Sequence, residues 1–553
     1  MNSSQRAFAP APPDWADEQI DVDVLVIGGG PAATWAAWSA ATCGARVALV
    51  DKGYCGASGA AAPSGNTVWY VPPDTERREA AIAKRLALGG ELCDRQWMSR
   101  VLEQTYACIH HLEDWGYPFP QDENGQIYRR SLQGPEYMRR MRQQIRRVGV
   151  QILDHSPALE LLVTADGTVA GALGLQRQTG KSWQVRAGAV VMASGGCAFL
   201  SKALGCNVLT GDGYRMAAET GADLSGMEFS NVYGIVPTFA SVTKNAFYRW
   251  ASFTYEDGTP VEGANAGKGR PLIARALLSQ PVYAQLTADD TTQAMMRTAQ
   301  PNFFLPFDRA GINPFAERFA ITLRLEGTVR GTGGIRVVDS TCATSTPGLF
   351  VAGDAASREL ICGGVSGGGS LNVAWAFSSG VWSGQAAATF ARSLGFHANS
   401  RKLYRVGASR LDQAAQTAQT AQTAAVLQPD RLIKAVQAEV HPYDRNLFRD
   451  ADTLTSSLQR LDALWHEVRD LALPEAERVR GYEALSMLAT ARWMYATALK
   501  RQESRGMHKR SDYPQVDSAQ AHRLNCGGFD SVWVKPEGLT ANLLLQPREV
   551  VTL

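Results

Sequence analysis

The sequence of 553 residues lacks several features that define common protein classes. None of its nine cysteines stands in a C-x-x-C pair, so we expect neither an iron–sulfur cluster nor any other metal site within the chain. No apolar run reaches the roughly 18 residues of a membrane span. The 55 lysines and arginines nearly balance the 53 aspartates and glutamates, which gives no indication of binding to nucleic acid or to an anionic membrane.

The amino terminus also lacks a secretory signal, because MNSSQRAFAPAPPDWADEQ has no basic region followed by an apolar core. Together with the odd number of scattered cysteines, this favours a cytoplasmic location. The chain is too long for one hydrophobic core, so we expect two to four domains. An apolar content of 45% and 52 glycines are typical of a turn-rich α/β protein.

The clearest motif is DVLVIGGGPAATWAAWSAATCGARVALVD at 23–51. It predicts a buried strand over 24–27, a glycine turn at 28–30, an alanine-rich helix, and a second strand over 47–50 that ends in Asp51. This order of elements is the fingerprint of a dinucleotide site. The alternative, a glycine-rich turn in another α/β protein, leaves Asp51 unexplained.

Each residue of this turn has a physical role in such a site. Gly28 permits the tight turn, Gly30 lets the backbone approach a pyrophosphate, and Ala33 is small enough to keep helix and strand close. The free N–H groups and the dipole at the start of the helix attract the phosphates. Asp51 is placed to hold ribose hydroxyls.

Three further segments lie far down the chain. AVVMASGG at 189–196 predicts a buried strand that ends in two glycines, and TGDG at 210–213 opens a helix. PGLFVAGD at 347–354 predicts a strand with a carboxylate at its C-terminal end, and a glycine-rich helix start follows within 363–380. This second glycine–aspartate strand end indicates FAD rather than NAD.

On these pieces, and on MEF at 227–229, GTGGIRV at 331–337 and RQESRGMHKRSDYP at 501–514, the chain resembles a family of flavoprotein subunits. The family comprises fumarate reductase, succinate dehydrogenase, L-aspartate oxidase and adenylylsulfate reductase. The resemblance covers about 22–395 well and the C-terminal region loosely.

The resemblance implies an α/β fold with a Rossmann-like FAD-binding domain that is discontinuous in sequence. An α+β capping domain would be inserted into it, and a helical domain would end the chain. The implied boundaries are 20–72, 130–230 and 328–395 for the FAD-binding domain, 73–129 for a helical insertion, 231–327 for the capping domain and 396–553 for the helical C-terminal domain. Within the last, QAAQTAQTAQTAA at 413–425 has a period of three, which predicts a polar helix or spacer rather than a coiled coil.

The resemblance also implies the contacts to FAD, residue by residue. They are Gly28, Gly30, Pro31, Ala32 and Ala33 for the pyrophosphate, Asp51 and Lys52 for the adenosine ribose, Ser58, Gly59, Ala60, Ser64 and Gly65 for the isoalloxazine, Ala158, Ser194, Gly195 and Asp212 for the adenine half, Gly353 and Asp354 for the ribityl chain, and Ser370 and Leu371 for the pyrimidine end.

Departures from the family pattern bear on the chemistry. The segment ASGAAAPSG at 57–65 lacks the flavin-linking histidine of succinate dehydrogenases, so we expect non-covalent FAD. Tyr233 replaces the histidine of the family's Q-F-H-P-T motif. Val329 replaces the histidine before M-G-G, with Arg330 next to it, and Val365 replaces the arginine of G-A-N-R-L-G.

The R-D-x-x-S-R stretch, whose arginine delivers a proton in fumarate reductase and aspartate oxidase, finds no match in 260–330. A C4-dicarboxylate needs cationic partners at both ends, because an unpaired buried carboxylate costs several kcal/mol. We therefore expect a small organic substrate that is not a C4-dicarboxylate.

The catalytic candidates are Tyr233, Arg330 and Arg249, and Tyr233 or Arg330 could transfer the proton that accompanies hydride transfer. Each could instead be structural, as a buried tyrosine or an ion-paired arginine.

Three functions stay open. They are an FAD-dependent oxidoreductase that dehydrogenates its substrate or catalyses the reverse, a flavoprotein subunit similar to adenylylsulfate reductase with a separate iron–sulfur (ferredoxin-like) partner, and a non-catalytic flavin-binding protein. The electron acceptor and a homo-oligomeric state also stay open.

Overall fold

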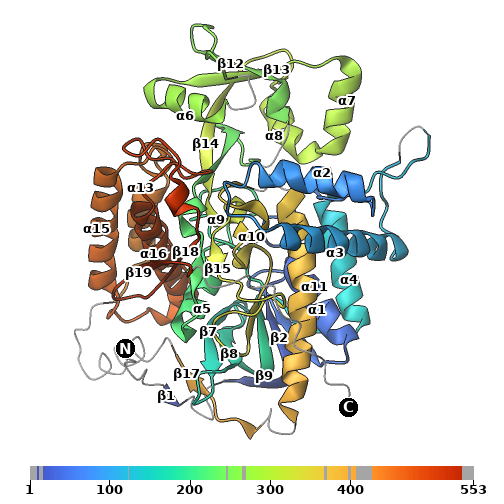
Figure 1. Ribbon diagram of the computed structural model, residues 1–553, viewed down its shortest axis with the longest axis vertical. Helices are drawn as coiled ribbons and strands as arrows, with labels where there is room; N and C mark the ends of the chain where they lie inside the picture. The colour runs from blue at the N-terminus through green and yellow to red at the C-terminus, as the bar shows by residue number, and fades with distance from the viewer. Residues whose placement is uncertain are drawn as a thin grey trace.

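The computed structural model describes residues 9–10, 16–121, 124–243, 247–264, 269–366, 370–395, 400–406 and 426–538, and the spacer expected at 413–425 lies outside them. A nine-stranded sheet forms the centre, helices pack on it, and two further bodies lie above and beside it (Figure 1). The α/β fold class expected from the sequence is confirmed, including the helical C-terminal region.

The central sheet has the strand order β1-β17-β7-β8-β9-β2-β3-β6, and β16 also pairs with β9. Its strands are β1 (Ala9–Pro10), β2 (Glu18–Ile27), β3 (Val47–Val50), β6 (Gln151–Leu153), β7 (Ala158–Val163), β8 (Val169–Leu175), β9 (Ser182–Met192), β16 (Leu349–Val351) and β17 (Tyr404–Arg405). β2, β3, β6, β9 and β16 pair in parallel, whereas the pairs from β9 through β8, β7 and β17 to β1 are antiparallel. The loops after the parallel strands therefore meet at one edge of the sheet.

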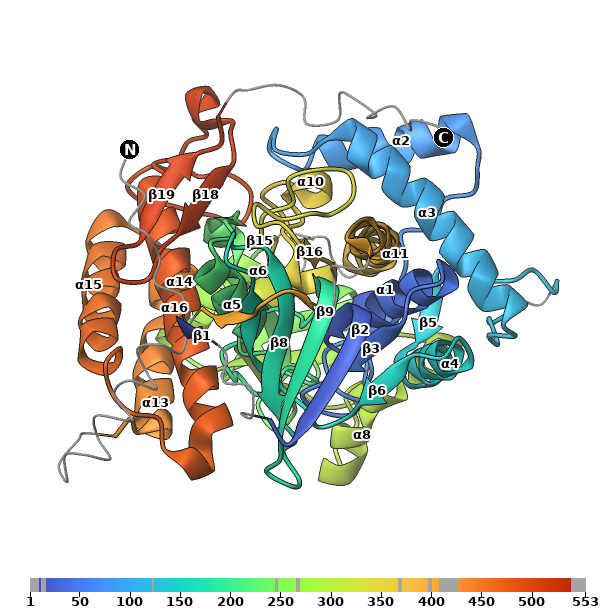
Figure 2. The same ribbon diagram turned by 90° about the horizontal axis from the view of Figure 1, so that it is seen from below.

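The parallel strands are buried on both faces, which explains their continuous apolar runs. Val24, Leu25 and Val26 in β2 have no exposed surface. Helices α1 (Pro31–Thr42) and α11 (Ser370–Ser393) cover one face of β2 and β9 (Figure 2). Helix α5 (Asp212–Thr220) packs on the other face.

Short elements and an outer helical layer complete this part of the chain. Asp94 caps the long outer helix α3 by accepting from the Trp97 N–H at 3.0 Å, and Asp74 caps α2 in the same way. The elements are α2 (Thr75–Leu86), α3 (Arg95–Asp114), α4 (Gly134–Arg147), α9 (Gly327–Arg330), α10 (Glu359–Cys362), the 3-10 turn η3 (Gly353–Ala355), and the paired strands β4 (Gly65–Thr67) and β5 (Ser131–Gln133).

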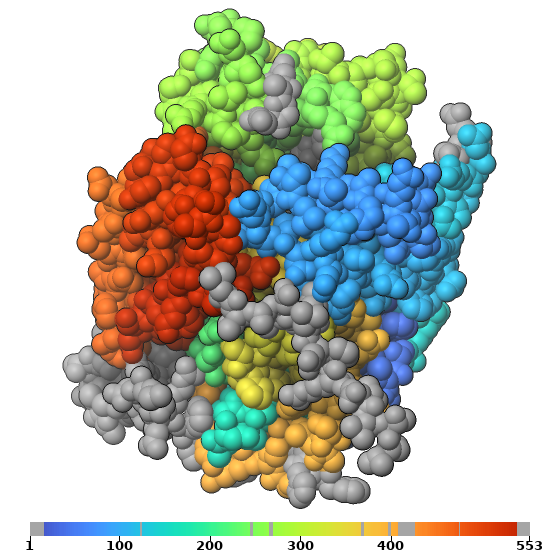
Figure 3. Space-filling view, in the orientation of Figure 1, coloured from blue at the N-terminus to red at the C-terminus, as the bar shows by residue number. Residues whose placement is uncertain are grey.

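The capping region lies above the central sheet (green in Figures 1 and 3). Its antiparallel sheet has the order β11-β14-β13-β12. The elements are β11 (Val232–Pro237), η2 (Phe247–Trp250), β12 (Ala251–Tyr255), α6 (Arg270–Ser279), β13 (Val282–Leu286), α7 (Asp290–Ala299), α8 (Pro301–Ala310) and β14 (Phe319–Glu326). The Asn302 side chain donates to the Pro63 carbonyl at 2.6 Å, so α8 contacts the loop that follows β3.

The C-terminal region packs beside the central sheet (orange and red in Figure 1). Strand β18 pairs with β10, which fastens this region to a segment from the middle of the chain. The elements of the C-terminal region are α13 (Pro429–Val440), α14 (Tyr443–Asn446), α15 (Ala451–Val468), η5 (Glu475–Glu477), α16 (Arg478–Lys500), η6 (Ser518–Gln520), β18 (Leu524–Gly527) and β19 (Trp533–Pro536). The segments from the middle of the chain beside it are β10 (Leu224–Ser225), η1 (Met227–Phe229) and β15 (Gly334–Ile335). Among the described residues, no helix is both long and apolar enough to cross a membrane. The domain boundaries given above stay a prediction.

Helices α1 and α11 approach each other closely because small residues line their contact. A Cβ on Gly384 would lie 2.3 Å from the Ala36 carbonyl oxygen, and one on Gly380 would lie 2.6 Å from that of Ala32. Both obstacles are backbone atoms, which cannot swing away. The position of α1, and with it the turn that precedes α1, therefore depends on glycines of α11.

We predict that Gly384→Ala destabilises the protein by about 1–3 kcal/mol, because overlap with the backbone of α1 outweighs the better helix propensity of alanine. Thermal unfolding of the FAD-loaded protein measures this. Gln385→Ala, at an exposed neighbouring position of the same helix, is the matched control and should change the stability little. An unchanged melting temperature for Gly384→Ala would contradict the close packing of the two helices.

Candidate functional site

A cavity of about 410 Å³ opens at the edge of the sheet where the parallel strands end. The loops after β2, β3, β9 and β16 form its floor, and Phe247, Ala299 and Gln300 of the capping region form part of its roof. Its described lining contains apolar, small, hydroxyl and amide side chains with Asp51, Lys52, Asp212, Arg330 and Asp354, but no histidine, cysteine or tyrosine.

The turn between β2 and α1 forms one wall. Gly28 has a φ of +122°, and a Cβ there would lie 2.2 Å from the Ala193 carbonyl oxygen, so only glycine fits. Gly30 has an ordinary φ of −83°, but a Cβ on it would meet no protein atom within 4 Å. A side chain at Gly30 would thus point into the open cavity, where a ligand can contact the backbone. Pro31 opens α1, whose free N–H groups face this space.

Asp51 at the end of β3 is oriented by its own loop. Its Oδ1 accepts from the Ser58 hydroxyl and the Gly53 N–H, both at 2.7 Å, while Oδ2 lies against Gly29. Burial raises the pKa of this carboxyl, and the Ser58 and Gly53 hydrogen bonds oppose that rise. This geometry leaves Oδ2 to accept a hydroxyl of a ligand.

The Lys52 ammonium has several partners within the protein, which the sequence did not predict. Its ammonium contacts Asp212 and Glu483, both at 2.7 Å, and the Thr210 hydroxyl at 2.8 Å. Glu483 comes from α16, so the C-terminal region reaches the wall of the cavity. Lys52 lines the cavity, but its three hydrogen-bonding directions are taken by protein partners.

Several buried polar atoms on the wall have no partner in the described chain. They are the Ser194 hydroxyl and Asp212 Oδ1 near one end, and Asn372 Oδ1 near Val329 and Arg330. Burying such atoms without a hydrogen bond costs free energy. These atoms fit a large polar ligand with hydrogen-bonding groups along its length, as a dinucleotide has.

Most residues expected to contact FAD line this cavity, although the individual contacts stay a proposal. They are Gly28, Gly30, Pro31, Ala32, Asp51, Lys52, Ser58, Gly59, Ala60, Gly65, Ala158, Ser194, Gly195, Asp212, Gly353 and Asp354.

The structure places Ala33, Ser64, Ser370 and Leu371 outside the lining. Ala33 lies on the face of α1 that packs against the sheet, and Ser64 is buried under the start of α4. At the start of α11, the residues on the cavity wall are Asn372, Val373 and Ala376 instead.

Two of the three catalytic candidates lie away from the cavity. The Tyr233 hydroxyl donates to the Val440 carbonyl at 2.9 Å, and burial raises the pKa of Tyr233 well above its usual value. Arg249 is exposed and stacks near the Trp250 ring at 5.2 Å. Arg330 does line the cavity, and its Nη1 donates to Glu326 at 2.8 Å.

Arg270 is a candidate that the sequence interpretation missed. It is an exposed residue in the first turn of α6 and does not line the cavity, and the surrounding chain lowers the pKa of its guanidinium by desolvation. Arg330 lowers this pKa further, and Glu326 opposes the shift. The structure describes no ion pair of Arg270. The sequence did hold a signal, because Arg270 and Arg275 keep the spacing of the two arginines in R-D-x-x-S-R, with Pro271 and Ala274 at the other positions.

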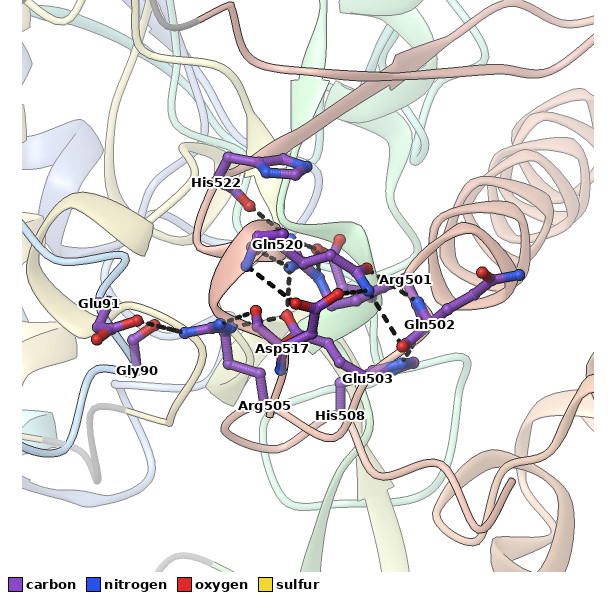
Figure 4. A network of polar contacts seen from close by, with 12 residues as sticks. Gly90, Glu91, Arg501, Gln502, Glu503, Arg505, His508, Asp517, Gln520 and His522 are labelled. Atoms are coloured by element: carbon purple, nitrogen blue, oxygen red, sulfur yellow. Dashed lines mark hydrogen bonds and ion pairs between the residues drawn. The ribbon is translucent and has the colours of Figure 1, made fainter. Parts of the chain in front are cut away.

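Arg501, Arg505 and His508 of the C-terminal motif form a buried network outside the cavity (Figure 4). Arg501 donates to Glu503 at 2.8 Å, and Arg505 donates to the same carboxylate at 2.7 Å and to the Gly90 carbonyl at 2.6 Å. Burial lowers the pKa of His508 well below its usual value, so the ring is neutral. The described contacts of this network join chain segments to one another.

Comparisons with known proteins agree with this geometry. A family model described as "FAD binding domain" matches residues 23–238, and one described as "Fumarate reductase flavoprotein C-term" matches residues 437–536. L-aspartate oxidase of Streptomyces coelicolor is 25% identical over 565 residues, covering 94% of this chain and 92% of that protein. The fumarate reductase flavoprotein subunit of Mycobacterium tuberculosis is 25% identical over 565 residues, covering 91% and 94%.

Solved structures show the same fold. Quinol fumarate reductase FrdA of E. coli aligns with a TM-score of 0.78 at 20% identity, covering 95% of this chain and 98% of that chain. Adenylylsulfate reductase of Archaeoglobus fulgidus aligns with a TM-score of 0.72 at 17% identity, covering 97% and 98%.

Fold and cavity define an FAD-binding flavoprotein with a helical C-terminal region. The chain carries an FAD binding domain and a fumarate reductase flavoprotein C-terminal domain, and its relatives include L-aspartate oxidase and fumarate reductase flavoproteins, as its sequence motifs indicated. It binds FAD and is an FAD-dependent oxidoreductase.

We predict that the flavin is released by acid. A covalent link needs a nucleophilic side chain such as histidine, cysteine or tyrosine, and the described lining contains none. Acid precipitation of the purified protein should leave the flavin band near ~450 nm in the supernatant. Colour retained in the pellet would show a covalent bond and contradict the interpretation of segment 57–65.

We also predict a pH-dependent stability that depends on Glu359. Burial is the main cause that raises the pKa of Glu359 from 4.5 to about 7, and the nearby Glu228 adds to it. Glu228 and Glu359 each have one buried carboxylate oxygen without a partner in the described chain. The folded state thus holds a proton that the unfolded state releases. Stability should fall as the pH rises from about 4.5 to about 7, by on the order of 1–3 kcal/mol, and level off above.

Melting temperatures across this range measure the effect as the difference between the wild type and Glu359→Gln, which mimics the protonated acid. The difference should favour the variant increasingly towards pH 7. Glu103→Gln, at an exposed position of α3, is the control and should follow the wild type at each pH. A constant difference between wild type and Glu359→Gln would contradict a buried proton.

Proposed function

We propose that this flavoprotein transfers an electron pair between FAD and a small organic acid that carries one anionic group, and that C4-dicarboxylates are poor substrates. The observation that carries the proposal is that Arg330 lines the cavity, and that Arg270, outside the lining, lies close enough to Arg330 and Glu326 to interact with both electrostatically. These residues bring two guanidinium groups against one carboxylate, Glu326, which leaves an excess of positive charge.

An excess of positive charge in a partly desolvated site favours an anion, and arginine binds a carboxylate through two parallel hydrogen bonds. Bound FAD supplies the acceptor or donor of the electron pair at its ring. Arg330 and Arg270 would bind the substrate anion, and Phe247 with the capping helices would exclude water from the reacting atoms.

The proposal against dicarboxylates rests on two positions at which the family motifs carry a further cation. Val329 and Val365 stand where the resemblance expects a histidine and an arginine, and both valines lack a charge. A second carboxylate there would lose its hydration without a cationic partner, which costs several kcal/mol.

The electron partner is proposed from the relatives. Several of them are named as flavoprotein subunits, which indicates that they work within larger assemblies. The described residues of this chain hold no cluster of three or more metal-binding side chains. We propose that a separate iron–sulfur protein, or oxygen, exchanges electrons with the flavin, and that the protein acts in the cytoplasm.

Anaerobic reduction of the bound flavin tests the substrate class. A panel of saturated and 2-hydroxy monocarboxylates should contain compounds that bleach the flavin, whereas succinate, malate and aspartate should not. With the best compound, Arg330→Met and Arg270→Met should each lower kcat/KM by at least about tenfold, the effect of one charge-assisted hydrogen bond.

Arg297→Gln is the matched control, because this capping-region arginine forms an exposed ion pair with Asp308 and should leave kcat/KM unchanged. Reduction by succinate at a rate equal to that with the best monocarboxylate would contradict the proposed substrate class. A flavin that no metabolite reduces and no partner oxidises would support the non-catalytic alternative.

A further inference from the structure

We propose that Arg358 is a positioning residue that ties two walls of the cavity together and thereby holds Arg330 in its anion-binding position. This inference rests on the proposed function, because it gives Arg330 the role of binding the substrate anion. It assigns to Arg358 a role that the sequence motifs do not assign.

Arg358 has no exposed surface, although it is charged. Its Nη1 donates to the carboxylate of Asp354, which lines the cavity at the end of β16. Its Nη2 donates to the carbonyl of Thr328 at 3.0 Å, to that of Val329 at 3.3 Å, and to that of Gly331. One guanidinium therefore connects the Asp354 turn with the turn of α9.

The α9 turn is the one that carries Arg330. Val329 and Arg330 both line the cavity. The three carbonyls that accept from the Arg358 side chain belong to Thr328, Val329 and Gly331, so they flank Arg330 in the sequence. The Arg358 backbone N–H also donates to the Thr332 carbonyl at 2.8 Å. Four backbone groups around Arg330 are thus fixed by one residue, so the direction of the Arg330 side chain depends on Arg358.

A second contact strengthens this connection. The Tyr214 hydroxyl lies 2.9 Å from the Thr328 hydroxyl and 2.8 Å from the Asp354 carbonyl, and thus joins the same two turns. Both turns also face the cavity, where the FAD ring and the substrate must meet. A movement of Asp354 on the cofactor side would consequently move the α9 turn on the substrate side.

The chemistry at this place requires arginine. A planar guanidinium can bind a carboxylate with one nitrogen and several carbonyls with another, whereas a lysine ammonium is a compact charge on a flexible chain. Lysine at 358 would keep the ion pair with Asp354 but could not reach the carbonyls of the α9 turn at the same time. The two functions of Arg358 can therefore be separated by substitution.

The experiment uses the FAD-loaded protein and acetate as the probe anion. Acetate binding is followed by the perturbation of the visible flavin band, and FAD affinity by flavin fluorescence. The variants are Arg330→Met, Arg358→Lys, Arg358→Met and the double variant Arg330→Met with Arg358→Lys. Because Arg358→Met leaves three carbonyls unpaired and could unfold the protein, Arg358→Lys is the decisive variant.

We expect Arg330→Met and Arg358→Lys each to weaken acetate binding by about tenfold, and the double variant to be no weaker than either, since both remove the same interaction. Arg358→Lys should keep the wild-type affinity for FAD, and Arg358→Met should lose part of it through Asp354. Arg324→Met is the matched control. Arg324 also donates to two backbone carbonyls, those of Ser201 and Ala240, but does not line the cavity, so its loss should leave acetate binding unchanged.

The outcomes separate the two proposals. If Arg330→Met weakens acetate binding but Arg358→Lys does not, the positioning role of Arg358 is overturned and the proposed function stands. If the double variant is weaker than both single variants by the product of their effects, Arg358 acts independently of Arg330 and the inference is overturned. If Arg330→Met binds acetate as the wild type does, or the wild type does not bind it, the anion site of the proposed function fails, and the inference fails with it.

Discussion

The position of the turn that borders the cavity depends on the close packing of α1 against α11 and the sheet. The turn at Gly28 must stay open towards the cavity, so no side chain can brace it from that side. It is held from behind, where Gly380 and Gly384 of α11 let the backbones of the two helices meet. The same α11 presents Asn372 and Val373 to the cavity, so one helix contact positions two parts of the cavity wall.

Buried charge is the second constraint, because a buried charged side chain needs a partner of opposite charge, and that partner can come from a distant segment of the chain. Glu228 of η1 accepts from Arg501 at 2.8 Å, and Lys52 at the cavity wall binds Glu483 of α16 at 2.7 Å. The C-terminal region therefore completes the charge balance of the cofactor domain from two sides. This region is also the part of the chain that matches the family model for the C-terminal part of fumarate reductase flavoproteins.

The sequence predicted local features well, but it did not predict contacts between residues that are far apart in the chain. The strands at 24–27 and 47–50 and the turn at Gly28 follow from short-range patterns of apolar residues and glycine. The contact between Tyr233 and the Val440 carbonyl joins residues more than two hundred positions apart, and no local pattern marks it. Arg270 is hard to recognise for another reason, since Pro271 and Ala274 stand where the motif R-D-x-x-S-R has its Asp and Ser, and only the spacing of the two arginines is kept.

The charge distribution at the cavity explains how one fold can serve different substrates. The pyrophosphate turn depends on backbone geometry, which tolerates few changes. In the proposed function the substrate anion is bound by side chains such as Arg330 on the cavity wall, and side chains can be exchanged without altering a strand or a helix. A cation on the cavity wall binds an anion well only when its backbone is held in place. In the inference drawn above, the buried Arg358 provides this support through the carbonyls of the α9 turn.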